Sequence, residues 1–329
     1  NDGDEIRIMK TSNDHNFYRS RDEILITWSG KEVVILGANE DGQVDGTRPT
    51  IYGGQLASTE SIFKCTSGAS DQSHFVNLIF DGEDTCQSCF EQSVTGNHNS
   101  SFINCRFTQA TTHGVEVVSS NYYSYYGCRF DNNGADGLNQ LGSQFNIVEK
   151  CLFDNNAGDG ADIVSGCRVT DCVFYNNGGK GLDSSISGSF FHNNIFDDNG
   201  SYGHALDGSG RATCTGNIYS NNTSEGIYTG DNKMVTFLNC AFFNNGGIGD
   251  AQGVHGESGY NDHRIFHNYI PGTSAENPNW RDTAIFDFTP GNTYEGRGAG
   301  MPSPIAYFGL TASDIGINRW KLSETISVF

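Results

Sequence analysis

The chain has 329 residues, which is long enough for one or two ordinary domains or for a solenoid whose repeats contact only their neighbours. Only 36% of the residues are apolar, and 42 are glycine, which argues against a broad globular core. The formal net charge of −20 argues against nucleic acid and anionic membranes as partners, because clustered lysine and arginine bind phosphate groups. No stretch approaches the ~18 apolar residues of a membrane span, so we expect no membrane insertion.

Residues 1–60 carry no clean repeat. Two short runs, Ile24–Trp28 and Val33–Gly37, predict strands that are separated by a turn. A solenoid needs a cap over its first open turn. We therefore expect an N-terminal cap and the first strands in this region.

A repeat starts near residue 61 and is regular from residue 105 to 249. An aromatic residue anchors each repeat, and successive anchors are 21 to 23 residues apart. The anchors are Phe107, Phe130, Phe153, Phe174, Phe196, Tyr219 and Phe242. A period of this length indicates a solenoid. Each repeat divides into three short runs separated by turn residues, which leaves no room for a helix. We predict an all-β, single-stranded parallel β-helix over residues 61–250, with three parallel sheets, about 22–23 residues per turn, and non-repeating caps at 1–60 and 251–329.

Two recurring residue types support this interpretation. Pairs such as Asn132-Asn133 follow the anchors, and asparagine suits left-handed turns and stacked hydrogen-bond ladders; sugar binding by these residues is the alternative. Four of the ten cysteines share one repeat position, which predicts buried, reduced thiols. The isolated Cys86–Cys89 motif predicts a loop and strand edge rather than a zinc or redox site.

The anchor phrase, the asparagine pairs and the Asp-Gly turns resemble the right-handed parallel β-helix superfamily with the pectate-lyase-like fold, over about residues 30–250. The segments Phe286–Gly291 and Asp314–Gly316 resemble the closing part of bacterial and phage members. The opening Asp2–Arg7 and Asp41–Arg48 are similar to β-helical proteins encoded by marine phages. The resemblance implies a right-handed helix and a place on a virion, on a cell surface or outside the cell.

Two columns of polar residues follow from the expected register. The first lies nine residues past the anchors and contains Glu116, Asn139, Asp162, Asp183, Asp207 (taken as displaced by two residues) and Tyr228. Because it alternates with apolar neighbours, it should face solvent. Carboxylates on successive turns suit either glycosidase chemistry or a calcium site made of Asp162, Asp183 and Asp207.

The second column lies six residues past the anchors and contains His113, Asp136, Asp159, Lys180, His204 and Glu225. A lyase needs a base and a group that neutralises the substrate carboxylate, and Lys180, His204 and Arg211 are the candidates. Carbohydrate contacts are expected from Glu116, Asn139, Tyr228, Asp136 and Asp159. The alternative is that both columns are solvated polar ladders.

The sequence lacks the catalytic phrases of polygalacturonases and the Trp-Ile-Asp-His phrase of pectate lyases. We therefore favour a structural or adhesive protein, such as a phage virion surface, fibre or tail component, with possible glycan contact. The alternatives are a polysaccharide lyase or glycosidase that works on the Asp162/Asp183/Asp207 face, and an extracellular carbohydrate- or calcium-binding module. No cofactor is firmly implied. The expected partners are other virion or surface proteins, a second copy of the chain, or polysaccharide.

Overall fold

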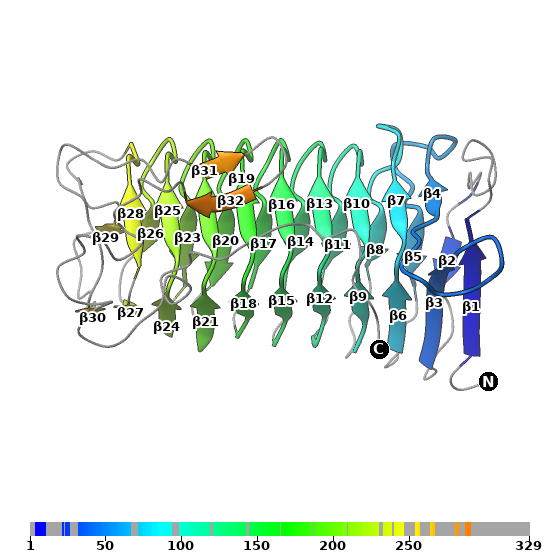
Figure 1. The fold of residues 1–329 in the computed structure, drawn as a ribbon, viewed down its shortest axis with the longest axis horizontal. Helices are drawn as coiled ribbons and strands as arrows, with labels where there is room; N and C mark the ends of the chain where they lie inside the picture. The colour runs from blue at the N-terminus through cyan, green and yellow to red at the C-terminus, as the bar shows by residue number, and fades with distance from the viewer. Residues whose placement is uncertain are drawn as a thin grey trace. The chain divides into compact units, whose positions relative to one another are not determined.

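The structure is a computed structural model of the chain, and it contains two compact units, residues 1–164 and residues 165–322. It describes residues 4–10, 22, 24–26, 32–66, 72–93, 99–118, 121–142, 145–164, 166–185, 187–208, 210–229, 233–238, 240–246, 254–256, 264–266, 280–282 and 287–290. Every regular element in these ranges is a β-strand (Figure 1). No helix among the described residues has the length and apolar character to span a membrane.

Three parallel sheets build the first unit, and we name them A1, B1 and C1. Sheet A1 contains β1 (Asp4–Met9), β3 (Glu32–Ala38), β6 (Gln72–Val76), β9 (Ser101–Ile103), β12 (Ser124–Tyr126) and β15 (Ile147–Glu149). Sheet B1 contains β4 (Thr50–Tyr52), β7 (Ile79–Asp81), β10 (Arg106–Thr108), β13 (Arg129–Asp131) and β16 (Leu152–Asp154). Sheet C1 contains β2 (Ile24–Ile26), β5 (Phe63–Cys65), β8 (Phe90–Gln92), β11 (Val115–Val117), β14 (Leu138–Gln140) and β17 (Ala161–Ile163). The described part of residues 1–60 thus supplies β1 to β4, which join all three sheets.

The second unit repeats the arrangement in sheets A2, B2 and C2. Sheet A2 contains β18 (Arg168–Thr170), β21 (Ser189–His192), β24 (Gly210–Thr215), β27 (Lys233–Leu238) and β30 (Arg264–Phe266). Sheet B2 contains β19 (Val173–Tyr175), β22 (Ile195–Asp197), β25 (Ile218–Ser220) and β28 (Ala241–Phe243). Sheet C2 contains β20 (Leu182–Ser185), β23 (His204–Asp207), β26 (Ile227–Thr229) and β29 (Val254–Gly256). The predicted all-β parallel β-helix is confirmed.

An antiparallel pair, β31 (Trp280–Asp282) and β32 (Asp287–Pro290), follows the parallel strands. Apart from β29 to β32, the predicted C-terminal cap or assembly segment, residues 251–329, lies outside the described residues. The phage-like phrase Asp314–Gly316 lies there too.

The aromatic anchors stack along the core of each unit. Neighbouring turns are in register at these residues, so that Phe107 pairs with Phe130 and Phe130 with Phe153. Their ring centroids are 5.1 and 4.7 Å apart. In the second unit Phe174 and Phe196 are 4.8 Å apart. The narrow core is therefore a column of rings, which explains how a chain with few apolar residues folds. All ten cysteines are buried with free thiols.

The two members of each asparagine pair have different structural roles, one in the turn and the other in the hydrogen-bond ladder. The first member has a positive φ, for example 55° at Asn132, a conformation that asparagine tolerates better than most residues. The second member is buried and donates to the next turn: Asn133 Nδ2 lies 2.9 Å from Asn156 Oδ1, and Asn199 Nδ2 lies 2.9 Å from Asn222 Oδ1. The expected ladder is present in both units and satisfies buried amides that would otherwise cost free energy.

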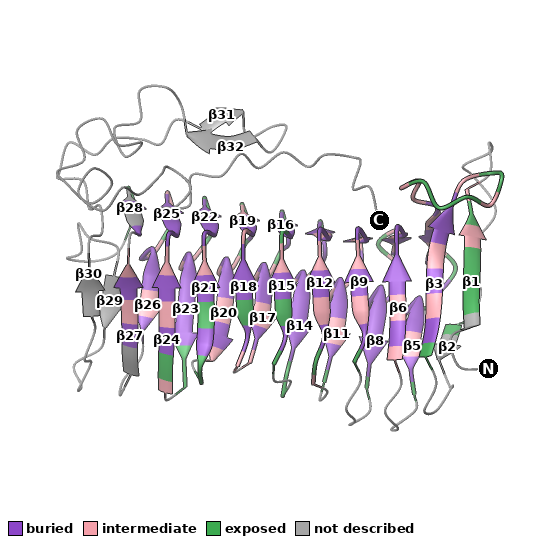
Figure 2. Ribbon diagram, turned by 60° about the horizontal axis from the view of Figure 1, so that its bottom comes forward, coloured by how far each residue is buried: buried purple, intermediate pink, exposed green. Residues whose placement is uncertain are grey.

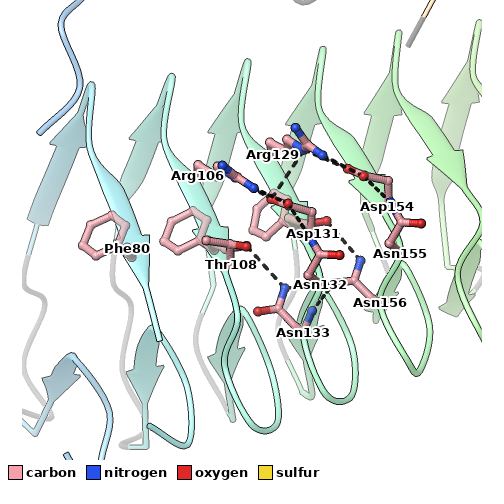
Figure 3. Close-up of polar contacts among 12 residues, drawn as sticks. Phe80, Arg106, Thr108, Arg129, Asp131, Asn132, Asn133, Asp154, Asn155 and Asn156 are labelled. Carbon is pink, nitrogen blue, oxygen red and sulfur yellow. Dashed lines mark hydrogen bonds and ion pairs between the residues drawn. The ribbon is translucent and has the colours of Figure 1, made fainter. Parts of the chain in front are cut away.

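Successive side chains along a strand point alternately into the core and toward the outer face of the sheet. Along β3, buried residues alternate with exposed and half-buried ones, which Figure 2 shows by colour. The same alternation on sheet B1 directs Arg106 and Arg129 outward, as expected for Arg129. Each arginine forms a bidentate ion pair with the aspartate of the next turn, Arg106 with Asp131 and Arg129 with Asp154 (Figure 3). Both aspartates are fully buried.

Candidate functional site

The predicted outward column is present on sheet C1. Parallel register places Glu116 beside Asn139 and Asn139 beside Asp162. Glu116 and Asp162 are half-buried and Asn139 is 9% exposed, while the flanking Val115 and Leu138 are fully buried. The prediction that this column faces outward is correct for the first unit.

The column also extends toward the N-terminus, which sequence reasoning missed. Lys64 and Glu91 precede Glu116 in register, and Lys64 Nζ lies 3.1 Å from Glu91 Oε2. The anchor phrase is irregular before Cys105, so counting from anchors did not find them. The signal that was available is the apolar–polar–apolar run Phe63–Cys65.

A polar network lies where the chain enters β11 and β14 of sheet C1. It contains His113, Asp136 and Asn139. Nδ1 of His113 lies 3.3 Å from Asp136 Oδ2, and Nε2 lies 3.2 Å from Asn139 Nδ2. Nδ1 of His113 also accepts a 3.3 Å hydrogen bond from the backbone N–H of Asp136. The backbone N–H of Asp159 donates to Asp136 Oδ1 at 2.7 Å. This network offers amide and carboxylate groups of the kind that hold sugar hydroxyls.

Sheet C2 carries a second cluster, composed of Lys180, Asp183, Tyr202, Asp207 and Tyr228, which we call the lysine–tyrosine cluster. Lys180 Nζ donates to Asp183 Oδ2. Burial raises the pKa of Asp183; Lys180 acts in the opposite direction, and the nearby Asp207 carboxylate raises this pKa further. The rings of Tyr202 and Tyr228 stack with centroids 4.9 Å apart. They lie on the next two turns, where the Tyr202 carbonyl accepts from the Gly181 N–H and Tyr228 follows Asp183 and Ala205 in register.

The register of sheet C2 corrects two assignments. Asp183 pairs with Ala205, which pairs with Tyr228, whereas Asp207 pairs with Ser185. The count of nine residues past the anchor therefore holds at Ala205 without any displacement, and Asp207 lies two residues further along β23. The same count of six leads to Tyr202 and not to His204.

His204 therefore faces inward, and this corrects its expected place on the outer face. It is fully buried, stacks on Phe196 with centroids 5.3 Å apart, and shares a 2.8 Å hydrogen bond between Nε2 and Ser184 Oγ. Burial lowers its pKa to about 3. A neutral imidazole inside the core does not reach a substrate on the surface of the sheet.

Arg211 also lies away from the cluster. It is an exposed residue of β24 in sheet A2, where it pairs with Met234, while Lys180 and Asp183 belong to the turn and strand of sheet C2. Of the six candidate catalytic residues, the structure thus brings Lys180, Asp183 and Asp207 together. Asp162 belongs to the first unit.

The proposed calcium ligands do not form a recognisable metal site. Within the described ranges, no group of three or more His, Cys, Asp or Glu side chains is placed to hold a metal ion. Asp183 is committed to Lys180, which neutralises part of the charge that calcium would need.

The sequence matches the profile of the right-handed β-helix region over residues 85–210 and 163–278, which together cover more than half of the chain. The chain belongs to the right-handed β-helix family. This confirms the handedness that the resemblance implied. No curated protein matches the sequence of this right-handed β-helix protein.

Solved structures with a similar fold include an enzyme module and a viral protein. The A-module of the mannuronan C-5 epimerase AlgE4 from Azotobacter vinelandii is 13% identical, with a TM-score of 0.56 over 82% of this chain and 87% of the module. ORF18 of Geobacillus virus E2 is 11% identical, with a TM-score of 0.51 over 80% of this chain and 52% of that protein. The periplasmic alginate epimerase AlgG is 11% identical, with a TM-score of 0.50 over 82% of this chain and 73% of that one. At these identities the likeness establishes the β-helix fold.

Proposed function

We propose that this protein is a structural or adhesive β-helix protein of a virion or cell surface, and that it contacts polysaccharide through the lysine–tyrosine cluster. The observation that supports this most is the stacked pair Tyr202 and Tyr228 beside the Lys180–Asp183 ion pair. Aromatic faces pack against the apolar faces of sugar rings, and neighbouring charged groups accept and donate hydrogen bonds to hydroxyls. A place on a virion or cell surface is compatible with a fold that viral and periplasmic proteins share.

The cluster is suited to binding because its groups are ordered but still accessible. The Lys180 and Asp183 side chains are 26% and 19% exposed, so water and ligand reach both. Stacking restricts the rotamers of the two tyrosines, which reduces the entropy that binding must remove. Asp207 is exposed and adds a further carboxylate acceptor near Asp183.

A direct test measures binding of the full chain to immobilised neutral and acidic polysaccharides. Tyr228→Ala should weaken binding at least about tenfold, as expected for a stacking residue at the centre of a site. Tyr175→Ala is the matched control, since Tyr175 is a half-buried tyrosine on β19 in sheet B2. Equal binding by wild type and Tyr228→Ala, or no binding to any polysaccharide, would contradict the proposal.

A second candidate function, polysaccharide cleavage, is favoured by one observation. Asp183 has a raised pKa next to a second carboxylate, which is the environment of a general acid. The same polysaccharides should be followed for new reducing ends and for absorbance of unsaturated products. Cleavage that disappears in Asp183→Asn would replace adhesion with catalysis as the function of this cluster.

A further inference from the structure

The first unit carries an exposed apolar strip where the chain passes from sheet C1 to sheet A1 on two successive turns. Half of the large exposed hydrophobic side chains that the structure describes lie here, and they define the strip: Val118, Tyr122, Leu141, Phe145 and Ile147. Phe145 is 54% exposed and Tyr122 is 46% exposed. Exposed apolar side chains gathered in one place mark an interaction surface, whereas scattered ones are ordinary.

The two aromatic residues of the strip adopt an unfavourable backbone conformation. Tyr122 has a φ of 66° and Phe145 a φ of 60°, in the left-handed region that bulky side chains rarely enter. The corresponding turns of the second unit carry Gly166 and Gly188, each with a φ of 75°. Each of these four residues lies three positions before a buried residue at the centre of a strand. An L-residue costs about 1–2 kcal/mol in this conformation, so the aromatic side chains are retained at the expense of fold stability.

The aromatic pair is pre-ordered. Ser124 pairs with Ile147, which places Tyr122 and Phe145 side by side on consecutive turns. Their rings stack with centroids 5.6 Å apart and an interplanar angle of 12°. A pair that is already stacked loses little side-chain freedom when a partner covers it. Because its two members lie on consecutive turns, the strip runs along the helix axis.

The strip is free of charge in a strongly acidic chain. Neither residues 118–124 nor residues 141–147 include Asp, Glu, Lys or Arg, while the whole chain has a net charge of −20. Charged groups lie at its border instead, where Lys150 bonds to the Tyr126 hydroxyl at 2.9 Å and lies near Glu149. An uncharged, aromatic centre with a polar border is the composition of a protein–protein interface.

We propose that the apolar strip is a self-association interface, which packs against the same strip of a second copy of this chain. Two copies of a polyanion repel each other least where neither carries charge. A strip that runs along the helix axis can face a copy of itself across a twofold axis, as closed homodimers require. Three of the five side chains are aliphatic, and these neither stack on sugar rings nor bind hydroxyls, which favours a protein partner over a glycan.

The test replaces the strained aromatics with the residue found in the second unit, in the double variant Tyr122→Gly/Phe145→Gly of the full chain. Sedimentation velocity across a concentration series should show wild-type dimers, and at least about a tenfold weaker dimer for the variant. Thermal melting of the variant at a concentration where wild type is monomeric should be unchanged or higher, because glycine relieves the left-handed strain.

The matched control is Phe190→Ser, an exposed aromatic residue of β21 in the second unit, which should leave association unchanged. Tyr228→Ala should also leave the mass unchanged, so failure here is separate from failure of the proposed glycan contact. The inference is overturned if wild type stays monomeric at all concentrations, or if the double variant associates as well as wild type. It is equally overturned if the double variant melts lower, since the rings would then hold the turns together.

Discussion

Two ion pairs on outer faces show how the same chemistry supports different roles. On sheet B1, Arg129 forms a bidentate pair with Asp154 of the next turn, and the aspartate is fully buried (Figure 3). On sheet C2, Lys180 pairs with Asp183 three residues along the same turn, and both side chains stay partly exposed. The first pair links two turns and shields its aspartate from solvent, whereas in the second pair both charged groups are open to a ligand. Burial and connectivity, more than charge, separate a structural pair from a candidate binding site.

The largest effect should come from breaking the buried pair. Arg129→Met leaves Asp154 buried without its cation, which should lower the free energy of unfolding by about 3–5 kcal/mol. Lys180→Met should lower it by less than about 1 kcal/mol, because water solvates the remaining carboxylate. Urea unfolding of the two variants measures the difference. Equal losses would show that the two pairs are energetically alike.

The two histidines also differ in burial: His204 is fully buried, whereas His113 is half-buried. The folded pKa of about 3 at His204 lies below the unfolded value near 6.5, so the unfolded state binds more protons between these values. Stability is therefore present above pH 6.5 and is lost as the pH falls, by about 1.4 kcal/mol per pH unit within this window. His204→Phe should remove this acid sensitivity while keeping the stack on Phe196. Melting curves from pH 7 to pH 4.5 test this, and parallel pH profiles of the two proteins would contradict it.

The asparagine-rich turns allow a comparison between a buried ladder residue and an exposed turn residue. Asn199 is buried and hydrogen-bonds to Asn222 and to the Phe174 carbonyl, so Asn199→Ala should lower the free energy of unfolding by about 1–3 kcal/mol. Asn176 is exposed and has a φ of 51°, so Asn176→Gly should change it by only a few tenths. The urea unfolding midpoints of both variants measure these two changes. A larger loss for Asn176→Gly would reverse the assignment of ladder and turn.

The smallest effect belongs to Asp183. Its folded pKa is raised, so its charge reduces stability above that pKa, and this penalty disappears as the pH falls below it. Asp183→Asn should therefore melt at least as high as wild type at pH 7, with the difference below about 1 kcal/mol and shrinking toward pH 4. A stability difference between the two proteins that grows as the pH falls would contradict this prediction. The same variant should weaken glycan binding, which distinguishes a binding group from a stabilising one.

Much of the fold could be predicted because the repeat reports the core directly. The anchors Phe130 and Phe153 stack as expected, and the second asparagine of each pair builds the expected ladder. Glu116, Asn139 and Asp162 fall in one column because counting from the anchors works wherever turns have equal length. Periodicity is thus a reliable guide to register within regular turns.

The site was predicted less well, because the polar residues of β23 do not occupy the positions that counting from the anchors gives. Ala205 occupies the position nine residues past the anchor, in register with Asp183. The prediction placed the acidic Asp207 there instead, and the same shift of two residues placed His204 on the outer face. The register is set by the backbone, where Gly203 N–H bonds to the Glu225 carbonyl of the next turn. The Arg129–Asp154 pair was missed because it runs diagonally between turns, and only the three-dimensional register reveals it.

The asparagine ladder also bears on the chemical lifetime of the protein. Four of its members precede glycine, a sequence that deamidates readily when the glycine nitrogen can attack the side-chain amide: Asn133, Asn177, Asn199 and Asn245. In the folded turns both reacting groups are held, as at Asn199, whose amide bonds to Asn222 and whose following Gly200 N–H bonds to the Asn177 carbonyl. Asn245 is only half-buried. Peptide mapping of aged protein should find aspartate at Asn245 before Asn199, so the stacking of turns also sets the order in which the molecule decays.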